Sequence, residues 1–176
     1  PKAMEMTGEV ANGWLGTSFM PEQADIFLEP LLRGLTKSGR TLADIDVQVG
    51  GSLEIDEDVE RLIEARRPAM AFTLGGMGSA NTNFYNDAFK RAGYAEAAEK
   101  VQALWVGGDK AAAIRAVPDE MVLKTNLIGT RDMIIERIKA YAAAGVTTLR
   151  ISTSGQNWRE RTETLAEATD LIHSIQ

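Results

Sequence analysis

Residues 128–151, IGTRDMIIERIKAYAAAGVTTLRI, decide the fold class, because they place a capped amphipathic helix directly before a strand. Gly129-Thr130 suits the start of the helix, and Gly145 stands where helices commonly end in a left-handed residue. The run 146–151 is rich in β-branched residues and predicts a strand. Apolar residues that recur at spacings of three and four give the helix its core face: Ile134, Ile135, Ile138, Tyr141 and Ala142.

The same alternation of helix and strand extends along the rest of the chain. Residues 1–11 predict a helix, 14–18 a short buried strand with the loop that leaves it, and 21–38 a second helix. Residues 46–53 predict another strand, followed by a helix that Asp56 caps and that Pro68 interrupts. Short helical patterns then continue to about residue 123, the clearest at 94–106, and residues 158–175 predict a closing helix. This order indicates right-handed βαβ units and a parallel sheet.

The composition is that of an ordinary globular protein. The 176 residues, 44% of them hydrophobic, suffice for one sizeable core. A net charge of −6 argues against duplex nucleic acid or an anionic membrane surface as the main partner. With no cysteine and one histidine we expect no disulfide and no metal site, which suits a cytoplasmic protein. No apolar run approaches the ~20 residues that a membrane span needs.

Four ordered segments resemble the C-terminal half of the bacterial luciferase-like superfamily, and within it the oxidoreductases that depend on the deazaflavin coenzyme F-420. The opening, PKAMEMTGEVANGWLGTSFMPE, is similar to that family's Gly-Pro-Lys helix, A-[DN]-G-W strand entry and T-P-E-like helix start. LGGMGSANTNFYNDAFKRAGY resembles the region inserted after the family's seventh strand. AVPDEMV and the stretch 128–151 resemble its final helix and eighth strand.

The resemblance implies an α/β fold, namely a TIM (β/α)8 barrel of the luciferase-like type. Residues 1–176 would be the C-terminal half of this single domain, from roughly helix 5 to helix 8, with an insertion at about 75–124. Three strands cannot close such a barrel, which takes about 250 residues, so we expect the missing N-terminal half in a longer gene product or another copy. We expect an apolar inner face whose exposure costs on the order of 10 kcal/mol, so that residues 1–176 would not fold alone.

Two loops predict an anion site, because N–H groups at a helix start lack intrahelical partners and loops that follow barrel strands bind phosphates. By resemblance these loops would hold the phosphate of the cofactor, with hydroxyl and backbone donors from Thr17 and Ser18. The alternative is that Thr17 and Ser18 merely cap the helix at Pro21. The predicted cofactor-binding residues are Pro1, Lys2, Gly16, Thr17 and Ser18.

Other candidate residues favour structural roles. LGGMGSAN lacks the spacing of a nucleotide-binding loop and predicts a helix break instead. The run 81–86 mixes aromatic and amide side chains, which suits a substrate lid or, slightly better, an oligomer contact. We interpret His173 as a surface residue. The carboxylates of residues 54–58 are mostly caps and solvated charges, although Glu54 could reach the barrel mouth. The sequence identifies no catalytic residue.

The resemblance implies an oxidoreductase that transfers a hydride between coenzyme F-420 and a small organic substrate. A deazaflavin carries carbon in place of the flavin N5, so it passes hydride in two-electron steps, and the protein contributes orientation and electrostatics. One alternative is an FMN-dependent monooxygenase of the same superfamily, and another is an incomplete barrel that serves only as an interaction module. The expected partners are the small-molecule substrate and further copies in a homodimer or higher homo-oligomer.

Overall fold

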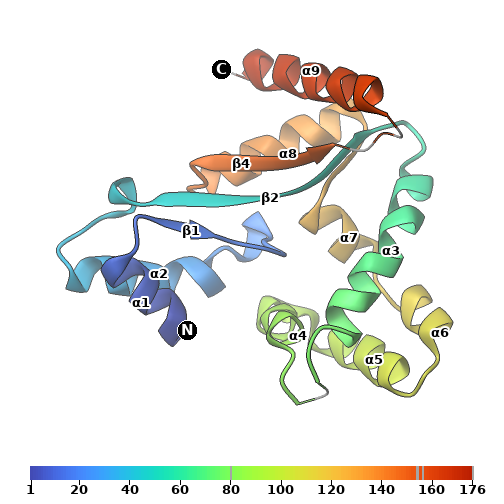
Figure 1. Ribbon diagram of the computed structural model, residues 1–176, viewed down its shortest axis with the longest axis horizontal. Coiled ribbons are helices and arrows are strands. Elements are labelled where there is room, and N and C mark those ends of the chain that lie inside the picture. Colours follow the sequence, from blue (N-terminus) through green and yellow to red (C-terminus); the bar gives the residue numbers. More distant parts are fainter. Residues whose placement is uncertain (80, 154, 156, 176) are drawn as a thin grey trace. The chain divides into compact units, whose positions relative to one another are not determined.

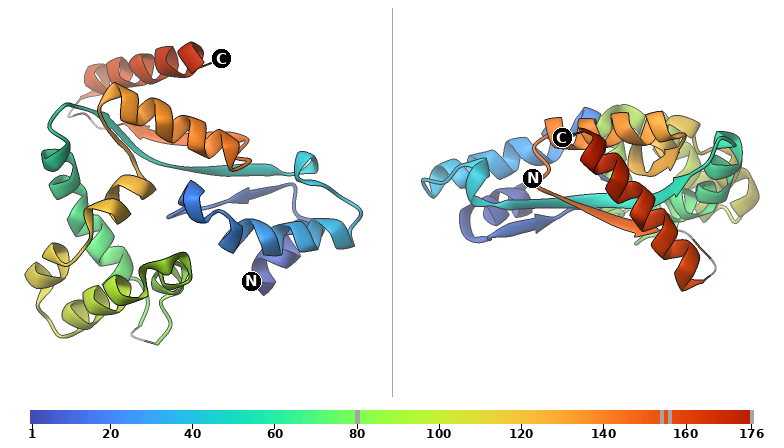
Figure 2. Two further views of the ribbon diagram at one scale, coloured as in Figure 1. Left: turned by 180° about the vertical axis from the view of Figure 1, so that it is seen from behind. Right: turned by 90° about the horizontal axis from the view of Figure 1, so that it is seen from above.

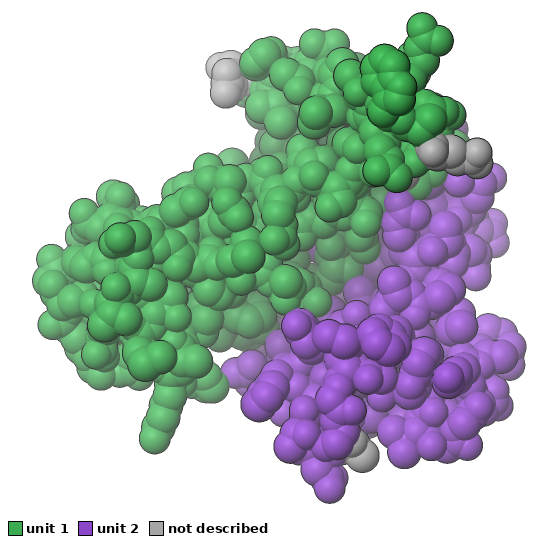
Figure 3. Space-filling model, in the orientation of Figure 1, with its two compact units in different colours: residues 1–56, 125–176 green, residues 57–124 purple. Residues whose placement is uncertain are grey.

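The computed structural model describes residues 1–79, 81–153, 155 and 157–175. The chain forms two compact units, coloured separately in Figure 3. Unit 1 comprises residues 1–56 and 125–176, and unit 2 comprises residues 57–124. Unit 2 is therefore one continuous segment inserted between the two parts of unit 1.

Unit 1 contains a parallel sheet whose central strand is β2 (Asp46–Ile55). The strands β1 (Gly13–Leu15), β3 (Leu127–Gly129) and β4 (Thr148–Thr153) all pair with it, and β1 and β4 are seen beside β2 in Figure 1. Gln48 pairs with both β1 and β4, and Leu53 pairs with both β3 and β4. Since a strand has two edges, β4 follows one edge of β2, while β1 and β3 share the other. The strands predicted around Trp14, Val49 and Leu149 are thus confirmed, and β3 is an additional strand.

The core of unit 1 forms where helices cover the sheet. These helices are α2 (Asp25–Lys37), α8 (Arg131–Ala143) and α9 (Trp158–Ile175), and α2 is preceded by the 3-10 turn η1 (Pro21–Gln23). On β2, Val47, Val49 and Leu53 are fully buried. Because residues two apart on a strand share a face, one face of β2 lies against the helices. The buried helix residues of this core are Leu28, Leu31, Leu35, Ile134, Tyr141, Ala168 and Leu171.

The structure corrects two expectations about burial in unit 1. The predicted buried strand at residues 14–18 is the three-residue β1, in which Trp14 is half-buried and Leu15 is 57% exposed. On α9, the apolar spacing predicts that Leu165, Ala168, Leu171 (or Ile172) and Ile175 face inward. Ala168 and Leu171 are buried as predicted, whereas Leu165 is 49% exposed. The closing helix has the predicted bounds.

The first helix, α1 (Lys2–Val10), packs against α2 at a glycine contact, and the two helices lie side by side in both orientations of Figure 2. A Cβ atom at Gly34 would overlap the carbonyl oxygen of Glu5, and a Cβ atom at Gly8 would overlap that of Leu31. Backbones that approach this closely leave no room for a side chain, so glycine is required on both helices.

Unit 2 is helical. It contains α3 (Val59–Gly75), α4 (Phe84–Phe89), the π-helical turn η3 (Lys90–Tyr94), α5 (Ala95–Val106), α6 (Lys110–Arg115) and most of α7 (Asp119–Thr125). The predicted helix break is confirmed, since α3 ends at Gly75. The prediction that Pro68 interrupts α3 is wrong, because Pro68 lies inside a continuous helix. The N-cap of α3 is Asp58 and not the predicted Asp56. The Asp58 Oδ1 accepts the Arg61 N–H at 3.1 Å.

Two buried amides hold the end of α3 against α4 and α5. Asn83 donates through Nδ2 to the Thr73 and Leu74 carbonyl oxygens, and its Oδ1 caps α4 by accepting two N–H groups. Asn86 donates to the carbonyl oxygens of Leu74 and Ala98. In the run 81–86, Asn83 and Asn86 therefore have structural roles. Phe84 of the same run is 80% exposed. Ala80, in the LGGMGSAN motif, lies outside the described residues.

Candidate functional site

The loop Gly16–Ser18 turns sharply at the carboxyl end of β1. The Gly16 N–H extends the sheet by donating to the carbonyl oxygen of Gln48 at 2.9 Å. A Cβ at Gly16 would lie 2.8 Å from the Trp14 ring and from Val49 Cγ1, so a larger residue does not fit without a shift. Ser18 has a φ of 54° and is the single non-glycine residue with positive φ in the described part of the chain. Backbone strain of this kind is concentrated at functional sites.

Thr17 and Ser18 do not cap the helix that follows them. The turn η1 has Met20 as its N-cap and α2 has Ala24, and neither start receives a side-chain hydrogen bond. Neither hydroxyl is hydrogen-bonded to another described residue. Thr17 is exposed and Ser18 half-buried. The capping interpretation is therefore wrong, and within the described part of the chain both hydroxyl groups have no partner and could serve a ligand.

Pro1 and Lys2 lie on a different element, at the start of α1. Pro1 is the N-cap, and its carbonyl oxygen accepts the Glu5 N–H at 3.0 Å. Lys2 is exposed. Across the described residues, no hydrogen bond or ion pair joins Pro1 or Lys2 to the loop Gly16–Ser18. Three of the five predicted residues, Gly16, Thr17 and Ser18, thus lie together in one loop. Pro1 and Lys2 make no polar contact with that loop among the described residues.

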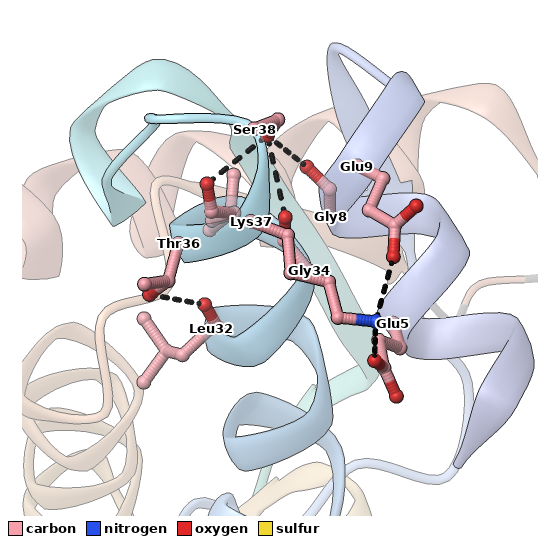
Figure 4. Close-up of polar contacts among 9 residues, drawn as sticks. Glu5, Gly8, Glu9, Leu32, Gly34, Thr36, Lys37 and Ser38 are labelled. Carbon is pink, nitrogen blue, oxygen red and sulfur yellow. Dashed lines mark hydrogen bonds and ion pairs between the residues drawn. The ribbon is translucent and has the colours of Figure 1, made fainter.

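A shallow depression of about 260 Å³ beside Lys2 holds an ion-pair cluster between α1 and α2. In Figure 4 the ammonium group of Lys37 lies between two carboxylates, those of Glu5 and Glu9, and the Glu9 Oε1 is 3.2 Å away. The hydrogen bond and the charge of Lys37 lower the pKa of the Glu5 carboxyl, and the same contacts raise the pKa of Lys37. Because carboxylates already neutralise Lys37, this depression does not attract anions.

The face of β2 that points away from the helices is polar. Alternating with the buried residues Val47, Val49 and Leu53 are the half-buried residues Gln48, Ser52 and, directly after Leu53, Glu54. We expected this face to be apolar. That expectation is wrong for β2, and the unfavourable exposure of about 10 kcal/mol that it implied does not apply to polar side chains.

The neighbouring strand β4 repeats the pattern. Its residues Leu149 and Ile151 pack against the core of unit 1, and Arg150 and Ser152 alternate with them and are exposed. Strand geometry therefore places Arg150 and Ser152 on the polar face, beside β2. Arg150 was not among the residues predicted from the sequence, although the polar residues Thr148, Arg150 and Ser152 recur with the period of two that marks one face of a strand.

The remaining candidates lie elsewhere. His173 is exposed on α9, as predicted. The Asp56 N–H donates to the Gly129 carbonyl oxygen at 3.0 Å, so the backbone there serves the sheet. Over the described ranges, no three His, Cys, Asp or Glu side chains gather in a way that could hold a metal ion. No helix of this part of the chain is long and apolar enough to cross a membrane.

Comparison with known proteins gives likenesses over nearly the whole chain. Rv3520c of Mycobacterium tuberculosis, provisionally named a coenzyme F420-dependent oxidoreductase, is 29% identical over 154 residues, which are 86% of this chain and 44% of that protein. The 5,10-methylenetetrahydromethanopterin reductase of Methanopyrus kandleri is 29% identical over 148 residues, which are 84% of this chain and 40% of the reductase. The chain thus spans less than half the length of these relatives.

Solved structures give the same result for the fold. The coenzyme F420-dependent tetrahydromethanopterin reductase of Methanopyrus kandleri matches with a TM-score of 0.72 and 26% identity, over 98% of this chain and 48% of that one. This likeness agrees with the α/β fold, parallel sheet and flanking helices predicted from the sequence. The family model of luciferase-like monooxygenases matches residues 1–148. The chain therefore belongs to the luciferase-like monooxygenase family.

Proposed function

We propose that this chain is part of an oxidoreductase that transfers a hydride between coenzyme F420 and a small organic substrate. The relatives named above are described as F420-dependent or as a reductase of a methanopterin compound. They support the F420 branch of the family. The bound deazaflavin would supply the hydride chemistry, and the residues of this chain would bind and orient it.

The observation that carries the proposal is the loop Gly16–Ser18. Its two hydroxyl groups have no partner among the described residues, and Ser18 is held in a left-handed conformation. A loop at the carboxyl end of a parallel strand is the usual place for a ligand in α/β folds. We infer that Thr17 and Ser18 donate hydrogen bonds to the phosphate of the cofactor. Pro1 and Lys2 belong to the proposal as a second contact from the start of α1.

The finer architecture also belongs to the proposal. We infer that residues 1–176 form the C-terminal half of a TIM-type barrel domain, from about helix 5 to helix 8, with an insertion at about residues 75–124. Phe84, with 80% of its surface exposed in unit 2, suits the contact of a homo-oligomer, since aromatic residues are enriched in interface cores. The lack of cysteine suits a cytoplasmic location.

A second candidate is an FMN-dependent monooxygenase, because the family model that matches the chain is that of the luciferase-like monooxygenases. The absorbance of the chromophore that copurifies with the full-length protein separates the two, since flavin and deazaflavin absorb differently. A flavin spectrum would refute the F420 assignment. A protein that neither copurifies with nor binds either cofactor would be an interaction module.

A double variant tests the loop. Thr17→Ala with Ser18→Ala in the full-length protein should weaken F420 binding by about 1–3 kcal/mol, because hydrogen bonds to a charged group are lost. The measurement is a fluorescence titration with F420. Thr36→Ala is the matched control, since the Thr36 hydroxyl donates within α2, to the carbonyl oxygen of Leu32 at 2.9 Å. Equal affinities of the double variant and the wild type would exclude the loop from the cofactor site.

A further inference from the structure

The loop Gly16–Ser18 is flanked on both sides by aromatic residues whose rings pack together. Trp14 precedes the loop on β1, and Phe19 follows it directly. Their ring centroids lie 6.0 Å apart in an edge-to-face arrangement, with an angle of 67° between the ring planes. Aromatic pairs in this geometry are favourable beyond the apolar area that they bury. The two ends of the loop are therefore joined by a packed pair of rings.

Helices α2 and α8 complete an aromatic cluster around Phe19. Between ring centroids, Phe27 of α2 lies 5.2 Å from Trp14 and 6.1 Å from Phe19. Tyr141 of α8 stacks on Phe19 at 6.0 Å, with an angle of 28° between the ring planes. Phe19 and Tyr141 are both 1% exposed. Because rings from three different elements surround Phe19, its side chain cannot move without disturbing the core of unit 1.

Polar contacts attach the backbone that leaves the loop to α8. The Tyr141 hydroxyl donates to the carbonyl oxygen of Phe19 at 3.5 Å. Burial raises the pKa of Tyr141, so the hydroxyl keeps the proton that it donates. The Arg137 guanidinium lies over the Tyr141 ring, 5.5 Å from the ring centroid, and forms an ion pair with Glu22 of η1. The segment after Ser18 is thus fixed at two points, Phe19 and Glu22.

Ser18 needs such support from its surroundings. A φ of 54° is unfavourable for serine, and a conformation of this kind persists only where the neighbouring structure imposes it. The Ser18 side chain has no partner within the described ranges, so it does not hold its own backbone in place. The constraint lies in the next residue, because the ring and the carbonyl group of Phe19 are both fixed in the core. The burial of Phe19 therefore determines how the backbone leaves Ser18.

We propose that Phe19 is a positioning residue: its ring, held in the aromatic cluster, keeps Ser18 in the left-handed conformation that presents the Thr17 and Ser18 hydroxyl groups to the cofactor. The inference rests on the proposed function, because it takes the loop as the cofactor contact. It adds a residue that acts on the ligand only through the loop. A loop released from the cluster would hold the binding conformation for part of the time, and its apparent affinity would fall in proportion to that fraction.

The first test is a fluorescence titration of the full-length protein with F420. Phe19→Leu should weaken binding roughly 10-fold, since a released serine is left-handed for about a tenth of the time or less. In a Ser18→Gly background the same substitution should cost only about twofold, because glycine adopts positive and negative φ about equally. Phe89→Leu is the matched control and should bind F420 as the wild type does. Phe89 is also 1% exposed, but it belongs to unit 2.

Urea unfolding of the same variants gives a readout that needs no ligand. Ser18→Gly should raise the urea midpoint of the wild type, because glycine removes the cost of the positive φ. In the Phe19→Leu variant, Ser18→Gly should lower the midpoint, because the released backbone no longer needs a positive φ and glycine only makes the unfolded chain more flexible. If the role of Phe19 were only to fill the core, Ser18→Gly would shift the midpoint equally with and without Phe19→Leu.

The outcomes separate this inference from the proposed function. If Phe19→Leu loses no F420 affinity, or loses it equally in the two Ser18 backgrounds, the inference is refuted while the proposed function stands. If the wild type does not bind F420, the proposed function fails, and the signs of the urea shifts still decide whether Phe19 holds Ser18. Should Phe19→Leu not fold, Tyr141→Phe, which removes only the hydroxyl group, replaces it in both backgrounds. A smaller loss of affinity in the Ser18→Gly background then supports the inference, and an equal loss refutes it.

Discussion

Gly34 lies where α2 crosses α1, and the carbonyl oxygen of Glu5 fills the space that a side chain would need. Gly34→Ala should lower the free energy of unfolding by about 1–3 kcal/mol, since the helices must move apart. Helix propensity alone predicts the opposite sign, because alanine is favoured over glycine by about 1 kcal/mol. Urea unfolding measures the difference, with Thr36→Ala on the same helix as control. A more stable Gly34→Ala variant would show that α1 and α2 do not pack this closely.

Asn83 gives a second prediction for a single residue. It is 4% exposed and serves four backbone groups, two carbonyl oxygens at the end of α3 and two N–H groups at the start of α4. Asn83→Ala should cost about 2–4 kcal/mol, because it removes a helix cap and leaves buried carbonyl groups unpaired. Thermal or urea unfolding measures the loss. The nearby Asn81 is exposed, so Asn81→Ala should stay within about 0.5 kcal/mol of the wild type. Similar losses for both variants would contradict the role assigned to Asn83.

The roles of single residues were the hardest part to predict. The aromatic and amide run 81–86 suggested a surface contact, because the sequence does not show that Asn83 meets the end of α3 ten residues earlier. Arg150 was overlooked because nothing in its own stretch of sequence marks it. A lone charge in a short strand has no partner in the sequence, and its place beside Gly50 follows only from the pairing of strands that are 100 residues apart. The loop Gly16–Ser18 was found because it directly follows a strand.

At the scale of elements, the contact between α1 and α2 should depend on pH through Glu5. The folded-state pKa of Glu5 is lowered, chiefly by the hydrogen bond from Lys37. The ion pair therefore stabilises the fold fully at pH values above the ordinary carboxyl pKa of 4.5, and this contribution is lost as the pH falls through the lowered value. Glu5→Gln should flatten the decline of the unfolding free energy in that acidic range.

The pH prediction is checked by chemical denaturation at a series of pH values below 6 and at a pH near neutrality. Glu29→Gln, an exposed glutamate of α2, is the control and should keep the slope of the wild type. Because Lys37 is exposed and Glu5 only half-buried, solvent ions reach the pair, and added salt should reduce the effect. A Glu5→Gln variant with the slope of the wild type would mean that the pair does not form in solution.

Long elements, in which the hydrophobic period repeats several times, were predicted well, and short elements were not. The bounds of α9 were found in full, and those of α8 to within one residue, because apolar positions repeat over several turns. The three residues of β3 carry no period of their own, and the cap of α8 follows them at once. Only their pairing with the end of β2 makes them a strand. The interruption predicted at Pro68 was wrong because a helix can continue through a proline when the packing of the helix compensates for the one lost hydrogen bond.

At the scale of the whole molecule, alternation of elements was enough to predict a parallel α/β sheet, and ordered motifs were enough to predict the family. The character of the sheet's second face was not predictable from the class. An apolar inner face was the expectation, whereas Gln48, Ser52 and Arg150 make much of the face polar, and Leu15 beside Gln48 is its exposed apolar residue. The difference was not visible beforehand because the class predicts where strands lie and not which side chains their second face carries.

The insertion of unit 2 has a consequence for the order of folding. The central strand β2 ends before unit 2 begins, and two of its three partner strands are synthesised only after unit 2 is complete. These pairings close a long loop, and such contacts are slow to form when the intervening chain is unstructured. A unit 2 that folds early would shorten the effective loop, so the helical insertion would act as an internal folding aid for the sheet. Substitutions that weaken unit 2 would then slow the formation of the sheet without touching a strand.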